Sequence, residues 1–187
     1  MSVKMVWSWA GRSRALARVL PLCGMVGIAL AGMSQSAGAQ TPPAPQTTTA
    51  TYQDWLVRCA SPEGQPKACE VAQTFQAQGG QGAIAQIALG RATKTDPMRL
   101  IVELPPGVRL PAGVTVQTSE KASPLTLAFQ TCPRSCFAEL ELKPDQVQAL
   151  RSASGPGVLT FEDGSRRKVQ LPVSFNGFAA ALDASQK

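Results

Sequence analysis

The chain of 187 residues contains no histidine, and only 5% of its residues are aromatic. The lack of histidine removes the commonest general base and metal ligand, and it excludes Ser–His and Cys–His nucleophilic pairs. The few aromatic residues, among them Trp55, fall mostly on strand faces that we interpret as core, so no aromatic-lined sugar site is visible. We therefore expect a protein without enzymatic activity, and we assign no catalytic residue.

One acidic pair leaves a catalytic alternative open. Glu139 and Glu141 stand two residues apart, on one face of a predicted strand. Two carboxyl groups on one face could share a site as general acid and general base. A solvated outer face explains the same pattern equally well.

The first 39 residues have the pattern of a secretory signal peptide. Basic residues without any acidic residue come first, followed by the apolar run Val19 to Met33 and an A-x-A cleavage motif at residues 37–39. The apolar run is shorter than the ~20 residues of a spanning helix, which argues against a retained anchor. We expect residues 1–39 to be removed, leaving a mature chain that begins at Gln40 without a transmembrane segment.

Removal of the signal peptide changes the charge balance. Four of the 18 basic residues would be lost, so 14 basic residues remain against 12 acidic ones, and the formal charge falls from +6 to +2. The basic cluster Arg166-Arg167-Lys168 follows a turn sequence, and we interpret it as a solvated hairpin arm. No nucleic-acid partner is expected.

The mature chain keeps four cysteines, Cys59, Cys69, Cys132 and Cys136. An even number of cysteines in an exported protein favours two disulfides, and three pairings are possible. We expect Cys59 to pair with Cys69 and Cys132 with Cys136, because each pair flanks a turn-rich stretch. In the chain-entropy model, loops of this size stabilise a fold by roughly 2 to 3 kcal/mol each.

The cysteines also admit two other interpretations. Zinc binding fits poorly, because the spacings of ten and four residues differ from paired C-x-x-C knuckles. A thiol–disulfide oxidoreductase generally has a two-residue spacing at a helix N-terminus, whereas strands are predicted on both sides of Cys132 and Cys136. Arg134 between them could favour a thiolate. A redox or folding factor is therefore the alternative function, and no metal or cofactor is expected.

The rest of the chain alternates short apolar strands with turns rich in Gly and Pro. We predict strands at residues 52–59, 69–76, 83–89, 98–103, 108–111, 114–117, 124–130, 137–142, 158–161 and 168–175, and helices at 143–150 and 178–182. No βαβ alternation is present, so the predicted fold is an all-β antiparallel β-sandwich with one or two short helices.

The predicted domain organisation is simple. Residues 40–51 have no apolar period and are rich in Pro and Thr, which predicts a disordered spacer. Residues 52–187 are long enough for a single β-sandwich domain.

Four stretches of the mature chain together resemble the invasion-associated locus B proteins, which are exported by alphaproteobacteria. They are DWLVRC at residues 54–59, ELPPGVRLPAGVTVQ at 103–117, TCPRSCFAEL at 131–140 and LPVSFNGFAAAL at 171–182. The resemblance extends from about Tyr52 to Leu182. It implies an immunoglobulin-like β-sandwich with paired cysteines, located in the periplasm or associated with the envelope.

The family name comes from a role in host-cell invasion, and the resemblance does not specify a molecular activity. We expect a periplasmic protein that acts as a binding factor, and association with the outer membrane or secretion are further possible locations. Its partner would be a protein in the envelope or on a host surface, since sheet edges and stapled loops can recruit such partners. The sequence identifies no ligand-binding residue.

Overall fold

The computed structural model describes residues 47–187 except residues 63, 78 and 80–81. The predicted signal peptide, residues 1–39, and the first part of the predicted spacer, residues 40–46, lie outside the described residues.

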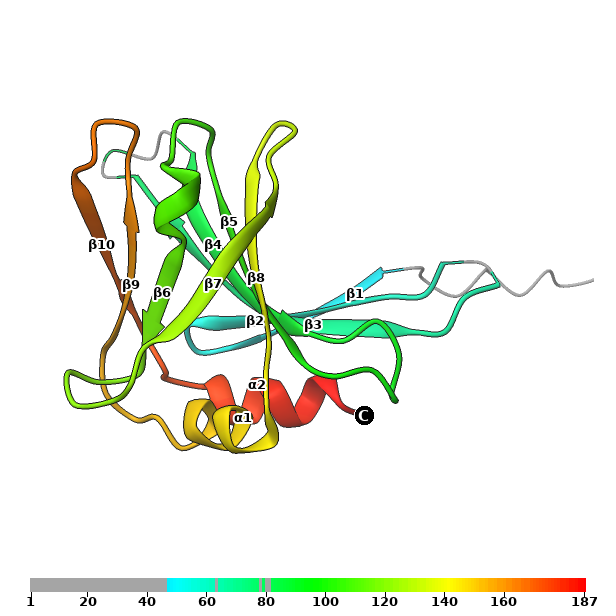
Figure 1. Cartoon of the computed structure of the whole chain (residues 1–187). Coiled ribbons are helices and arrows are strands. Elements are labelled where there is room, and N and C mark those ends of the chain that lie inside the picture. Colours follow the sequence, from blue (N-terminus) through cyan, green and yellow to red (C-terminus); the bar gives the residue numbers. More distant parts are fainter. Residues whose placement is uncertain (1–46, 63, 78, 80–81) are drawn as a thin grey trace, which may run out of the picture. The chain divides into compact units, whose positions relative to one another are not determined.

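The described part contains ten strands, two α-helices and one 3-10 turn (Figure 1). The strands are β1 (Thr47–Tyr52), β2 (Trp55–Ala60), β3 (Ala68–Gln76), β4 (Ala83–Gly90), β5 (Arg99–Leu104), β6 (Val114–Gln117), β7 (Leu125–Thr131), β8 (Cys136–Glu141), β9 (Gly157–Glu162) and β10 (Lys168–Val173). The helices are α1 (Pro144–Arg151) and α2 (Phe178–Ser185), and the 3-10 turn is Leu110–Ala112. These elements follow the predicted order closely, because the period-2 apolar pattern and the Gly/Pro turns recur throughout the chain.

The strands pair in the single order β1-β2-β3-β4-β5-β8-β7-β6-β9-β10, and all pairings are antiparallel. The prediction of an antiparallel β fold with two short helices is confirmed. The strand pairing does not show the finer prediction, an immunoglobulin-like sandwich of two sheets. Residues 125–127 of β7 pair with β6 while residues 128–131 pair with β8, so β7 links strands β1–β5 and β8 to strands β6, β9 and β10.

Alternating residues of the strands divide the sheet into a core face and a solvent face. On β2, for example, Trp55, Val57 and Cys59 are buried while Leu56 and Arg58 are partly exposed. Helix α2 covers the core face at β2, where Phe178 packs edge-on against Trp55 with 4.7 Å between ring centroids. Phe178 and Leu182, four residues apart on one face of α2, are both buried, so this helix covers one end of the core (Figure 1).

Three segments differ from prediction. The predicted strand 52–59 is divided by a turn at residues 53–54, so Tyr52 ends β1 and β2 begins at Trp55. The predicted spacer reaches residue 51, but Thr47–Tyr52 forms β1, because β-branched threonines pair well with β2 even without an apolar period. Residues 108–111 were expected to form a strand, but only Val108 makes an isolated bridge, to Asp163. The chain then turns through Leu110–Ala112, whose Pro111 cannot donate to a strand ladder.

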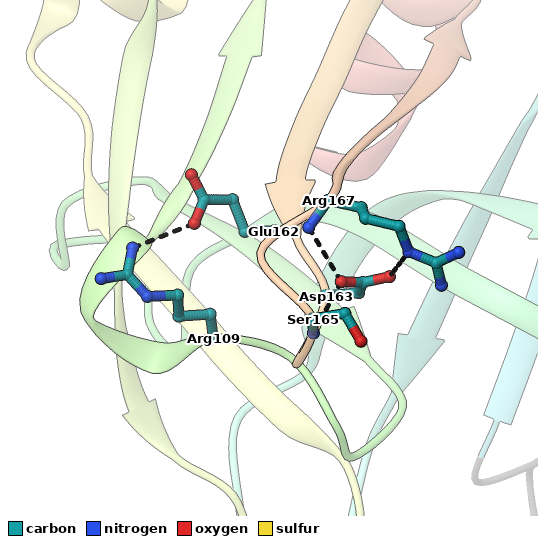
Figure 2. A network of polar contacts seen from close by, with 5 residues as sticks. All are labelled: Arg109, Glu162, Asp163, Ser165 and Arg167. Carbon is teal, nitrogen blue, oxygen red and sulfur yellow. Dashed lines mark hydrogen bonds and ion pairs between the residues drawn. The ribbon is translucent and has the colours of Figure 1, made fainter.

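The chain between β5 and β6 lies against the β9–β10 turn (Figure 2). The backbone N–H of Gly164 donates to the Gly107 carbonyl at 2.7 Å, and that of Arg109 donates to the Glu162 carbonyl at 2.9 Å. The Arg109 side chain also pairs with the Glu162 carboxylate at 3.0 Å. Backbone contacts therefore fix this segment at the rim, where its Pro and Gly residues are tolerated.

A polar cluster joins the two ends of the described chain. Ser174 donates through its hydroxyl to Asp54 at 2.6 Å, and its backbone N–H donates to Gln73 Oε1 at 3.1 Å. Its carbonyl oxygen accepts from Trp55 Nε1 at 2.8 Å and from Gln73 Nε2 at 3.1 Å. We call Asp54, Trp55, Gln73 and Ser174 the terminal latch, because it fastens the segment after β10 to β2 and β3.

Candidate functional site

The structure joins Cys59 to Cys69 and Cys132 to Cys136. Cys59 and Cys69 stand directly opposite each other on β2 and β3, with Cα atoms 4.0 Å apart. Cys132 and Cys136 close the tip of the β7–β8 hairpin. The four sulfur atoms therefore serve two separate pairs of strands and do not converge on one site.

The hairpin disulfide lacks the surroundings of a typical redox centre. Cys132 is exposed and Cys136 is fully buried, and strands flank both of them. A helix N-terminus, which lowers the pKa of the attacking thiol in C-x-x-C enzymes, does not adjoin them in the described structure.

Glu139 and Glu141 lie on the solvent face of β8, as predicted. Their neighbour is Arg99 of β5, which stands opposite Glu141 in the strand register and approaches the Glu139 carboxylate at 3.7 Å. The guanidinium gives Glu139 a nearby countercharge, and this ion pair is partly exposed. This arrangement is that of a solvated charged face.

The basic cluster at residues 166–168 is also part of a turn (Figure 2). Asp163 accepts from the backbone N–H groups of Ser165 and Arg167 at 2.8 and 3.0 Å, and from Arg167 Nε at 2.7 Å. These bonds, that from the Arg167 backbone first, hold the pKa of the Asp163 carboxyl below its usual value. Arg167 is thus used to close the β9–β10 hairpin.

A groove of about 650 Å³ opens on the solvent face of the sheet. Its lining comes from β2, β3, β4 and β5 together with Thr47 of β1, and residues 91–97 between β4 and β5 form one wall. The charged residues that line it are Arg58, Glu70, Arg91, Asp96 and Arg99. Three guanidinium groups against two carboxylates give the groove a net positive charge.

Strand register explains why the sheet is hollow there. Arg58, Glu70, Gly90 and Arg99 stand side by side across four adjacent strands, and neighbouring strands are about 4.8 Å apart. Gly90 alone contributes no side chain to this row. A Cβ at Gly90 would lie 3.0 Å from the Glu70 Cβ and 3.1 Å from the Cys69 carbonyl oxygen, so the space above Glu70 depends on glycine.

The charged side chains of the groove differ in whether they already have a partner within the protein. Arg58 donates to Glu70 through Nε at 2.6 Å, so these two neutralise each other. Asp96 accepts from the Thr93 backbone N–H at 2.9 Å and orders the wall. Among the described residues no carboxylate lies within ion-pairing distance of Arg91, and Arg99 has only its longer contact to Glu139. The positive end of the groove is therefore around Arg91 and Arg99.

The sequence does not predict this groove. Its residues come from five strands and a loop, and no single motif contains them. One signal was present, since a glycine within a strand pattern often marks close backbone approach. The end of β4 at Gly90 looked like an ordinary turn boundary.

Two further properties bear on function. Within the described ranges, no three His, Cys, Asp or Glu side chains come together in a way that could hold a metal ion. None of the helices in this part of the chain is long and apolar enough to cross a membrane.

Comparison with known proteins places the chain. The family described as "Invasion associated locus B (IalB) protein" matches residues 55–186. The invasion protein B homologs of Brucella abortus strain 2308 and Brucella abortus biovar 1 strain 9-941 are each 34% identical over 161 residues, covering 84% of this chain and 90% of the relative.

The crystal structure of invasion associated protein B from Bartonella henselae has a similar fold, with a TM-score of 0.63. It is 21% identical, and the alignment covers 73% of this chain and 93% of that one. The family match over almost all of the described structure agrees with the resemblance seen in its four motifs. The chain belongs to the invasion-associated locus B family.

Proposed function

We propose that this protein is exported to the bacterial envelope and acts there as a non-enzymatic binding factor, with a role in host-cell invasion. The groove beside Gly90 is the observation that carries the proposal. The partner is a protein that places an acidic side chain against Arg91 and Arg99, either in the envelope or on a host surface.

The geometry of the groove supports a binding role. A volume of about 650 Å³ accommodates several side chains of a partner. Arg91 and Arg99 can offer planar guanidinium donors to a carboxylate, which is the strongest common form of such recognition. Because the groove is open and partly exposed, its charges would direct association and specificity more than they would add affinity.

The cysteines support location outside the cytoplasm. Disulfides persist in oxidising compartments and are rare in reducing ones. Two disulfides in one small β domain, together with a predicted signal peptide, therefore favour export to the periplasm, with outer-membrane association or secretion as its final location.

A photoreactive amino acid placed in the groove tests the proposal in living cells. We expect such a residue at Ile101, which lines the groove, to give one covalent adduct of discrete mass. The same residue at Gln170, exposed on β10, is the matched control and should give none. The double substitution Arg91→Glu with Arg99→Glu should abolish the adduct at position 101. Equal labelling at both positions, or an adduct that survives charge reversal, would refute the binding role of the groove.

The alternative function, a redox or folding factor, is favoured by one observation, the exposure of Cys132 at a hairpin tip. The double substitution Cys132→Ser with Cys136→Ser separates the two functions. Under our proposal this variant keeps the groove adduct and the invasion phenotype at equal protein levels. Loss of the phenotype together with accumulation of reduced envelope proteins would support the redox function instead.

A further inference from the structure

The two edge strands of the sheet differ in how well they are protected. Edge strands expose unpaired backbone groups, and proteins usually blunt them with proline, charge or a bulge. At one edge, β10 carries Lys168 and Pro172. At the other edge, β1 has the sequence TTTATY, without proline, charge or glycine. Its register with β2 is unbroken over all six residues.

The turn between β1 and β2 determines which backbone groups face outward. Gln53 and Asp54 alone connect Tyr52 to Trp55, and Gln53 has a φ of +53°, as in the first position of a type II′ turn. In such a hairpin the closing pair is hydrogen-bonded, and hydrogen-bonded pairs then alternate along the strands. The N–H and C=O groups of Thr47, Thr49 and Thr51 consequently point away from β2, toward the free edge.

We propose that β1 of this protein pairs with β1 of a second copy, antiparallel, to form a two-fold symmetric dimer with a continuous sheet. Centring the two-fold axis at Thr49 pairs Thr49 with itself and Thr47 with Thr51, and about six backbone hydrogen bonds form.

The chemistry of β1 favours a second copy as the occupant. A self-pairing strand must avoid placing like charges opposite each other, and β1 carries none. Threonines facing threonines across the edge can also exchange side-chain hydrogen bonds. The pairing uses the backbone edge of β1 and none of the arginines of the groove, although Thr47 at the start of β1 also lines that groove.

The difference between the edges also explains why assembly stops at two copies. Pairing β1 with β10 of another molecule would build an open fibre. Pro172 lacks an N–H group, and Lys168 brings charge to that edge, so β10 pairs poorly with an added strand. Pairing through β1 uses the unprotected edge of both copies and leaves two protected β10 edges outside.

Sedimentation of the exported, oxidised protein tests the proposal. We expect the weight-average mass to rise from that of a monomer toward that of a dimer between about 1 and 500 µM, as for a small interface. Thr49→Pro removes the outward N–H without removing a bond to β2, and should weaken dimerisation at least tenfold. Thr49→Val keeps the N–H and is the matched control, which should dimerise like the parent.

A second variant guards against misfolding. If Thr49→Pro lowers the melting temperature, Thr49→Lys takes its place, since it keeps the backbone intact and sets two positive charges against each other across the axis. It should also be monomeric, with partial recovery of the dimer at high salt. A parent protein that stays monomeric at every concentration overturns the proposal. A dimer unaffected by both Thr49→Pro and Thr49→Lys also overturns it, as it must use another surface.

Discussion

The Ser174 carbonyl in the terminal latch offers a quantitative test of how the fold is held together. Its oxygen accepts from Trp55 Nε1 at 2.8 Å and from Gln73 Nε2 at 3.1 Å. Trp55→Phe removes the first donor and Gln73→Met the second. After either single substitution the carbonyl keeps one partner, whereas the double variant leaves it with none. The two substitutions should therefore be coupled.

The size of the coupling follows from the cost of an unpaired polar group. A buried acceptor without a donor costs about 1 to 3 kcal/mol, and Ser174 is only partly buried, so the lower end applies. We expect the double variant to be less stable than the sum of the single effects by about 1 kcal/mol. Lost ring contacts of Trp55 and the unpaired Ser174 N–H occur in single and double variants alike and cancel in the cycle.

Urea unfolding of the oxidised protein, followed by far-UV circular dichroism, measures the free energy of unfolding of the parent, the two single variants and the double variant. The control cycle combines Trp55→Phe with Glu162→Gln, since Glu162 pairs with Arg109 instead, and should be additive. Additivity within about 0.5 kcal/mol in the latch cycle as well would refute the reasoning, because it would mean that the two donors do not share the Ser174 carbonyl in solution.

Two further predictions concern turns. Gly177 has a φ of +80°, and a Cβ there would overlap the Tyr52 carbonyl oxygen, so Gly177→Ala should lower the free energy of unfolding by about 3 kcal/mol or more. The control is Gly155→Ala, whose Cβ meets no atom within 4 Å, and it should change the free energy by less than about 0.5 kcal/mol in the same unfolding assay. The lowered pKa of Asp163 means that its carboxylate stabilises the fold above about pH 4 and that this contribution is lost as pH falls through the lower folded value. Asp163→Asn should therefore reduce the acid dependence of stability, and an unchanged profile between pH 7 and pH 3 would contradict this.

Local structure was predictable from the sequence because each strand carries its own period-2 signal. Strands β3, β4 and β9, helix α1 and the β7–β8 hairpin lie within about two residues of their predicted positions, and helix α2 begins where predicted but extends to Ser185. Strand β1 was missed because all of its side chains except that of Tyr52 are exposed, so it has no apolar period to detect. The β-branched character of its threonines was the only available signal.

Long-range arrangement was not predictable in the same way. The pairing of β5 with β8 and of β6 with β9 skips intervening strands, and nothing in either strand specifies its partner. The groove depends instead on the register between strands that follow one another in the chain, since the pairing of β3 with β4 and of β4 with β5 brings Glu70, Gly90 and Arg99 into one row. A site made by strand register leaves no motif in the sequence.

Most residues of the groove lie outside the motifs that identify the family, although Arg58 belongs to the first motif. Asp54 and Trp55 of the first motif meet Ser174 of the last motif in the terminal latch, although they lie 120 and 119 residues away from it along the chain. Arg91 and Asp96, by contrast, lie in the loop between β4 and β5, outside all four motifs. Substitutions in the loop can change charge without disturbing a core contact, whereas substitutions in the latch remove partly buried hydrogen bonds. Motif residues of the latch therefore hold the scaffold of this chain together, whereas the loop between β4 and β5 supplies part of the charge of its groove.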